Sequence, residues 1–270
     1  MSGKVDTIGS KNGIIGVTQQ IPSYTGLNMA GMDENLGNSG QMWSSCVDYY
    51  DARSGTDSNN RWYAIGGSNR YLTMTNSTWH REWPTYWRLG GISEASRGAF
   101  NASPRNSYAC SIMAWVYNDY ELQGTTHEEI VNMSIAGQRV SVGKGYWNST
   151  YNGLSLMYGG TGHWVIPTST MGGTFPGWNH IVWNISGSNS GSSGCYINGE
   201  WYQMTSMGGA HGGSAGWMFG SNASGTSESW QGKVGEFWIF STTLNGSQSR
   251  YFFNQGRARY QNPKYNFRQY

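Results

Sequence analysis

The acidic and histidine side chains of this 270-residue chain lack the spacings that catalysis or metal binding requires. Retaining glycoside hydrolases place two carboxylates roughly 5–5.5 Å apart on one groove, and no E-x-D-x-x-E spacing that would do this on a strand occurs here. His127-Glu128-Glu129 begins like the zinc-binding H-E-x-x-H motif, but residue 131 is Val, so a polar loop is expected. Three widely spaced cysteines indicate neither a zinc site nor a disulfide framework. We expect no catalytic residue, no metal ligand and no cofactor.

Residues that could bind a ligand are aromatic. Trp79, Trp83 and Trp87 recur every four residues, but Pro84 between them makes a continuous helix improbable. One interpretation is that these rings pack against the body of the protein or against a neighbouring subunit. The other is that Trp79 and Trp83 form a platform on which a sugar ring stacks.

A second aromatic group lies in a Gly- and Asn-rich stretch. Tyr146, Trp147, Asn148 and Tyr151 fall within six residues. Aromatic rings can stack on the faces of sugars while an asparagine amide binds their hydroxyls. Trp147, Asn148 and Tyr151 are therefore candidate carbohydrate-binding residues, and the alternative is a loop anchored by one buried Trp.

The composition indicates which elements carry these residues. The chain holds 14 Trp, 18 Tyr and 40 Gly, and only 12% of its residues are charged, against about 25% in ordinary domains. Aromatic residues favour strands and glycine favours turns and bulges, so the composition favours an all-β protein. A net charge of +2 is too weak for a nucleic-acid footprint. No run of about 18 apolar residues predicts a membrane span.

The local pattern predicts many short strands. The expected strand segments are 71–75, 110–117, 130–136, 154–158, 180–185, 194–203, 216–220 and 233–240. Both alternating faces of 110–117 are apolar, which predicts a central strand covered on both sides. Asn198-Gly199 predicts a type I′ hairpin. The only expected helix starts after Asn245 and ends at Gly256. This pattern predicts a two-sheet antiparallel sandwich.

Three motifs occur in order: W-x-H-I-V at 178–182, Y-I-N-G at 196–199 and G-K-V-G-E-F at 232–237. With these motifs, residues 43–256 resemble the concanavalin A-like, laminin-G-like jelly roll. The resemblance implies a lectin-like sandwich with one short C-terminal helix. Two parts depart from the family pattern: residues 79–92 are unusually aromatic, and the acidic calcium ligands of some relatives are not evident.

The N-terminal segment Val5 to Gly16 is similar to the opening of some bacteriophage virion proteins, such as tail fibres and head decorations. This resemblance implies a virion surface protein that is made and assembled in the host cytoplasm, which fits the lack of a recognisable signal peptide at this N-terminus. The implied partners are other virion proteins and further copies of the chain, with a trimer favoured. A host surface polysaccharide is a candidate partner. The alternative is a carbohydrate-binding module or free lectin without a structural role.

We expect three parts: an attachment arm at 1–40, the sandwich at 41–256 and a basic tail at 257–270. The arm has apolar patches, such as Ile14-Ile15, without the periodicity of an element that could bury them alone. The tail carries Arg257, Arg259, Lys264 and Arg268. It is either a solvated segment or an arm that docks on an acidic neighbour.

Overall fold

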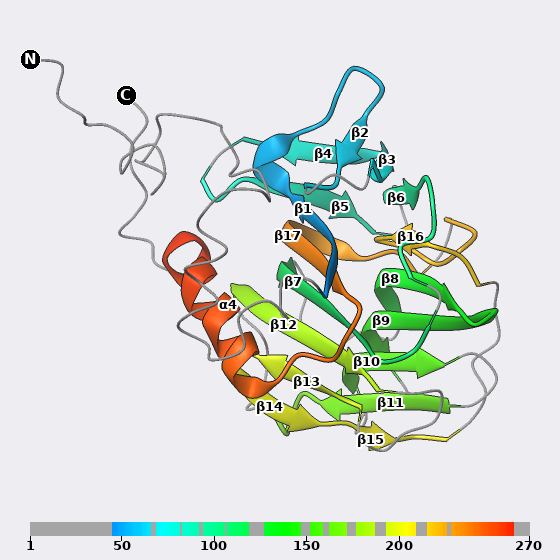
Figure 1. Cartoon of the computed structure of the whole chain (residues 1–270), viewed down its shortest axis with the longest axis vertical. Coiled ribbons are helices and arrows are strands. Elements are labelled where there is room, and N and C mark those ends of the chain that lie inside the picture. Colours follow the sequence, from blue (N-terminus) through cyan, green and yellow to red (C-terminus); the bar gives the residue numbers. More distant parts are fainter. Residues whose placement is uncertain are drawn as a thin grey trace, which may run out of the picture.

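Two antiparallel β-sheets form the body of the protein in a computed structural model (Figure 1). The structure describes residues 45–65, 69–81, 83–91, 94–105, 107–118, 127–146, 152–158, 162–171, 177–186, 193–208, 215–225 and 228–261. The predicted arm and the last nine residues of the predicted tail lie outside these ranges. The two sheets confirm the predicted all-β sandwich.

Sheet A carries the helix of the protein. Its strands, in spatial order, are β14 (Glu200–Gln203), β13 (Gly194–Ile197), β12 (Trp178–Ile185), β7 (Cys110–Asn118), β17 (Gln231–Phe240), β5 (Tyr86–Gly90) and β4 (Ser77–His80), and β1 (Cys46–Asp51) also pairs with β17. The short helix η1 (Ala52–Ser54) follows β1.

Sheet B packs against the inner face of sheet A. Its strands, in spatial order, are β15 (Thr205–Ser206), β11 (Gly162–Pro167), β10 (Asn152–Tyr158), β9 (Gln138–Tyr146), β8 (Glu128–Ile135), β16 (Met218–Phe219), β6 (Arg97–Phe100), β3 (Tyr71–Thr75) and β2 (Arg61–Tyr63).

Strand β7 shows why the sequence folds in this way. Ile112, Ala114 and Val116 point into the core between the sheets. Met113 belongs instead to a second apolar cluster on the outer face of sheet A. Because successive side chains alternate across a strand, one run fills two cores, which confirms the predicted central strand. The predicted hairpin is confirmed as well: Asn198 and Gly199 have φ values of 52° and 87°, the positive pair that a type I′ turn needs.

Helix α4 (Gly246–Tyr260) covers the second cluster and lies alongside β12, β13 and β14 (Figure 1). Asn245 caps it as predicted, in a capping box with Gln248. The predicted end at Gly256 is wrong, because the helix continues to Tyr260. Gly256 is instead the point where the helix approaches Trp115 most closely, since a Cβ there would lie 2.2 Å from the Trp115 Nε1 atom. Arg257 and Arg259 therefore lie in the last helical turn, not in a tail.

Candidate functional site: an aromatic platform on sheet A

The predicted glycan loop lies outside the described residues. Trp147, Asn148 and Tyr151 fall between the end of β9 at Tyr146 and the start of β10 at Asn152. The position of these three side chains therefore remains a prediction.

Trp79, Trp83 and Trp87, which recur every four residues, have different environments on the β4–β5 hairpin. Trp87 is buried in the core between the sheets. Trp79 is partly buried against the same core, and its indole N–H donates to the Ala52 carbonyl (2.8 Å). Trp83, beside the turn, remains 44% exposed. Trp87 and Trp79 thus pack against the body of the protein, as one of the two interpretations predicted. Of the three, Trp83 is the most exposed to solvent.

Three further aromatic side chains gather on the outer face of sheet A. Tyr86 comes from β5, Tyr117 from β7 and Trp178 from β12. The ring centroid of Trp178 lies 5.9 Å from that of Tyr86 and 6.0 Å from that of Tyr117. All three side chains are half-buried. We call this group the aromatic platform.

A cation lies in the middle of the platform. The Lys233 Nζ atom of β17 lies 4.4 Å from the ring centroid of Tyr117 and 5.1 Å from that of Tyr86. Such cation–π contacts are favourable and hold the ammonium group near the faces of the rings. The platform therefore combines rings that are tilted by 59° and 70° from one another with the positive charge of Lys233. His80 stacks on Tyr86 at its edge, with ring centroids 4.6 Å apart.

The end of α4 borders the platform. Tyr260 stacks on Trp115, with centroids 4.7 Å apart, and contacts Trp178 at 4.8 Å. A bulge in β17 makes room for it, since a Cβ on Gly235 would lie 2.2 Å from the Tyr260 hydroxyl. The neighbouring Arg259 lies 6.0 Å from the Trp83 ring. Trp83 thus stands at the margin of the platform.

Ion pairs anchor this border. Arg259 pairs with Glu236 of β17. Close by, Asp51 binds Arg53 and accepts a hydrogen bond from the Tyr49 hydroxyl (2.7 Å). Burial alone would raise the pKa of Asp51, but the Arg53 guanidinium outweighs this effect and holds the pKa below its usual value. The Glu236 pair thus joins the helix to the sheet, and the Asp51 contacts fix the end of β1 and the turn that follows it.

Sheet B contains a further cluster of charged groups. Arg139 donates from one nitrogen to both Glu129 and Glu228, and Asn132 donates to Glu129 at 2.9 Å. Burial raises the pKa of Glu129, and the Arg139 charge opposes this shift. Two carboxylates bound by the same guanidinium form a structural network, because neither is left to accept or supply a proton at an open site.

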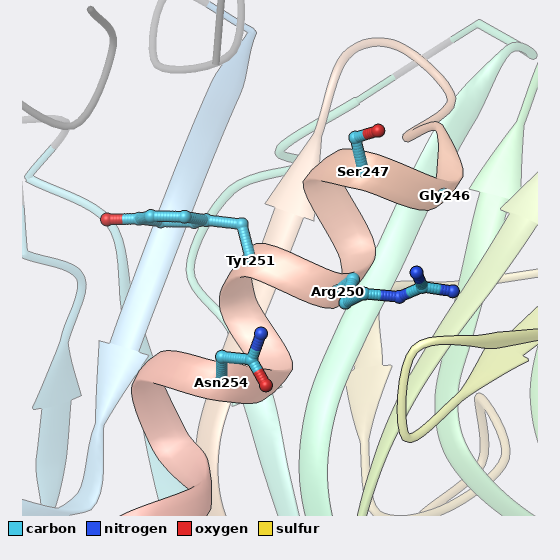
Figure 2. A pocket seen from close by; sticks show the side chains of 5 residues that line it. All are labelled: Gly246, Ser247, Arg250, Tyr251 and Asn254. Atoms are coloured by element: carbon cyan, nitrogen blue, oxygen red, sulfur yellow. The ribbon is translucent and has the colours of Figure 1, made fainter. Parts of the chain in front are cut away.

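A shallow pocket of about 500 Å³ lies on the outward surface of α4, lined by Gly246, Ser247, Arg250, Tyr251 and Asn254. Figure 2 shows Tyr251 and Arg250 pointing to opposite sides of the helix, with Ser247 and Asn254 one turn away on either side. Arg250 lies 3.5 Å from Glu200. With one ring and a cation that already faces a carboxylate, this pocket is a weaker candidate than the platform.

Among the described residues, no group of three or more His, Cys, Asp or Glu side chains is placed to hold a metal ion. No helix in the same ranges is long and apolar enough to cross a bilayer.

The platform residues lie in or near motifs that the sequence analysis identified, but the sequence did not predict that they come together. Trp178 is the first residue of one motif that carries the family resemblance, and Lys233 is the second residue of another. Tyr86 stands between Trp83 and Trp87. Tyr117 ends the outward face that the alternation of β7 predicts. The local sequence pattern does not predict the strand order β12-β7-β17-β5, and this order brings the residues together.

No protein-family description matches the chain, and no curated protein is similar to it in sequence. Solved structures do share its fold. Domain 4 of AbnA, a GH43 extracellular arabinanase from Geobacillus stearothermophilus solved in complex with arabinotriose, is 16% identical, with 76% of this chain and 97% of that one covered and a TM-score of 0.50. The binding domain of botulinum neurotoxin serotype D is 15% identical, with 79% and 52% covered and a TM-score of 0.52.

Botulinum neurotoxin type C, which depends on interaction with two ganglioside molecules to enter cells, is 13% identical, with 78% and 51% covered and a TM-score of 0.53. The chain thus spans about half the length of the neurotoxin chains that it matches. At such identities the similarity shows the fold alone, which is a sandwich of two antiparallel sheets.

Proposed function

We propose that this chain is a non-catalytic, glycan-binding surface protein of a bacteriophage particle, and that the aromatic platform is its glycan site. The observation that carries the proposal is the convergence of Tyr86, Tyr117 and Trp178 from three strands onto one outer face. Sugar rings have apolar faces that stack on aromatic side chains, while their hydroxyls bind polar groups at the edge. A sheet positions such rings more rigidly than a loop would.

The structural neighbours support glycan binding as the kind of activity to test. One was solved with arabinotriose, and another depends on gangliosides. These ligands belong to those proteins, and they motivate screening this chain against both polysaccharides and glycolipid head groups.

The test is a glycan array probed with the full-length protein, followed by calorimetry on the best ligand. Trp83→Ala removes a ring at the margin of the platform and Tyr86→Val removes one of its three rings, and both should weaken binding about tenfold or more, as is typical of lost aromatic stacking. The matched control is Trp201→Ala on β14, because Trp201 is 41% exposed against 44% for Trp83. Binding that survives both platform variants but fails in Trp201→Ala would move the site to the β13–β14 hairpin.

The loop that holds Trp147, Asn148 and Tyr151 is proposed as a second glycan contact. It joins two strands of sheet B, so its variants can be read separately from those on sheet A. Trp147→Ala should weaken glycan binding while the melting temperature stays unchanged. A large fall in melting temperature would instead support the alternative that Trp147 anchors the loop.

The placement on a bacteriophage particle rests on the similarity of Val5 to Gly16 to virion proteins. Many weak contacts on one particle would add through effective concentration. Electron microscopy of native particles, with this chain located in the map, tests the placement. A soluble chain that binds glycans but joins no particle would favour the alternative of a free lectin or carbohydrate-binding module. Turnover of a polysaccharide would overturn the non-catalytic assignment.

A further inference from the structure

The platform has a charge that glycan stacking alone does not need. Lys233 is half-buried on the outer face of β17, with its ammonium group near the faces of Tyr86 and Tyr117. A lysine on an ordinary surface moves through many rotamers, whereas ring contacts on two sides restrict this one. The positive charge is therefore held at one place beside the sugar-stacking surface.

The carboxylates that the structure describes near the platform do not neutralise this charge. Within the described ranges no carboxylate lies at ion-pair distance from Lys233. Glu236, three residues further along the same strand, pairs with Arg259. Asp51 is held by Arg53. Among the described residues, Asp51 and Glu236 are thus engaged by arginines and no carboxylate pairs with Lys233, so its ammonium group can take an anion from outside.

We infer that the platform takes an acidic saccharide, with the sugar ring on the aromatic faces and the sugar carboxylate on Lys233. This inference rests on the proposed glycan function and names the class of glycan. The ammonium lies 4.4 Å from the Tyr117 centroid, so a sugar stacked beside it can bring a carboxylate on its ring edge into contact. An ammonium–carboxylate hydrogen bond is stronger than a neutral one, which gives selectivity for the acidic sugar over its uncharged counterpart.

The experiment compares an acidic oligosaccharide with an uncharged ester of the same sugar chain and with a ligand that carries a different anion. Full-length protein is titrated calorimetrically with oligogalacturonate, with the same oligosaccharide as its methyl ester, and with a sulfated oligosaccharide of equal length. The acid should bind about tenfold more tightly than its ester.

Variants then assign the preference to one residue. Lys233→Met keeps a side chain of similar length between the two tyrosines and removes the charge, so the preference for the acid should disappear while affinity for the ester stays the same. Lys233→Arg should retain the preference. Arg250→Met is the matched control, since it removes an exposed positive charge from α4, and it should change neither affinity.

The outcomes separate the inference from the proposed function. Acid and ester binding equally, or a preference that survives in Lys233→Met, would overturn the acidic-saccharide inference and leave glycan binding intact. A preference for the sulfated ligand alone would overturn the assignment of a carboxylate. Binding to no glycan, acidic or neutral, would overturn the proposed function and this inference with it. Circular dichroism of each variant verifies that the fold is retained.

Discussion

A Cβ atom on Gly256 would lie 2.2 Å from the indole nitrogen of Trp115. Gly256 is in the interior of α4, and Trp115 projects from β7 on the outer face of sheet A. Because Gly256 lacks a side chain, the helix can lie directly on the indole. The same contact brings Tyr260 onto Trp115 and Trp178. One glycine thus sets how closely the helix end approaches the aromatic platform.

Because of this contact, replacing Gly256 by Ala should destabilise the protein, although the same change usually stabilises a helix. In an exposed helix interior, Gly→Ala stabilises by about 1 kcal/mol, but Gly256→Ala should lower stability by about 1–3 kcal/mol because the added methyl overpacks the interface. The measurement is thermal unfolding followed by circular dichroism.

Gly246→Ala is the matched control for that substitution. Its Cβ would meet the Tyr196 ring at 3.4 Å, an ordinary contact, so the melting temperature should hold or rise slightly. An unchanged or higher melting temperature in Gly256→Ala would contradict the close approach of α4 to Trp115.

The sequence predicted the elements with strong local signals. Apolar residues on both faces identified β7, and the Asn198-Gly199 pair identified its hairpin, because in each case neighbouring residues determine the conformation. The helix was placed by its cap at Asn245 but ended too early. Gly256 is a common type of residue at a helix end, and only the tertiary contact with Trp115 shows its other use.

The short strands at the edges were harder to predict. β4 and β5 lie in an aromatic segment that gave no alternation to favour one face, and sheet pairing is what makes them strands. The platform was missed for a related reason. Tyr86, Tyr117 and Trp178 are separated in sequence and meet only through the strand order of sheet A, which local patterns do not encode.

The buried network of sheet B gives a prediction about charge. Arg139→Met should destabilise the fold by about 3–5 kcal/mol, because it leaves the fully buried Glu129 carboxylate without its cation. Denaturant titration measures the loss. The double variant Arg139→Met/Glu129→Gln should recover part of it, since the amide carries no charge. Equal stability of the single variant and the wild type would show that the pair contributes nothing.

The same network fixes the sign of a pH effect. Burial raises the pKa of Glu129, and loss of Arg139 removes the charge that opposes this rise. Above the ordinary pKa of a glutamate, the unfolded chain has released this proton while the folded variant still holds it. The stability of the variant therefore falls as the pH increases. The deficit of Arg139→Met relative to wild type should therefore be larger at pH 8 than at pH 5.

His180 makes the sandwich sensitive to acid. It is fully buried beneath α4, 5.2 Å from the Trp115 ring, and burial lowers its pKa to about 3. The unfolded chain binds this proton near pH 6.5, so between about pH 6.5 and 3 unfolding takes up a proton and stability falls as the pH falls. The slope from this group approaches about 1.4 kcal/mol per pH unit.

His180→Leu should remove that slope. Urea unfolding at pH 5, 6, 7 and 8 should show the variant gaining on the wild type as the pH falls, with the smallest difference at pH 8. Parallel curves for the two proteins would mean that the imidazole has the same pKa in the folded and unfolded states, against its buried position among Trp115 and Phe253.

The last prediction concerns assembly. We expect the full chain to form a closed homo-oligomer, most simply a trimer, or to bind a symmetric lattice of another protein. Only 12% of its residues are charged, and Tyr63, Trp83 and Trp201 remain more than 40% exposed; interfaces are enriched in aromatic residues and depleted in charge at their centres. Ile14 and Ile15 add apolar surface in the predicted arm.

Light scattering coupled to size-exclusion chromatography gives the mass directly, and the result should be a fixed multiple of the 29.9 kDa chain over a wide concentration range. A closed ring saturates its interfaces, whereas an open, head-to-tail contact would give masses that increase with concentration. The double variant Ile14→Asp/Ile15→Asp tests the arm, because charges at these positions oppose burial and should shift the mass toward the monomer. Tyr63→Ser serves as its control, since it removes an exposed ring from the sandwich and leaves the arm intact. A compact monomer at every concentration, with no binding to purified particles, would contradict assembly as the role of the arm.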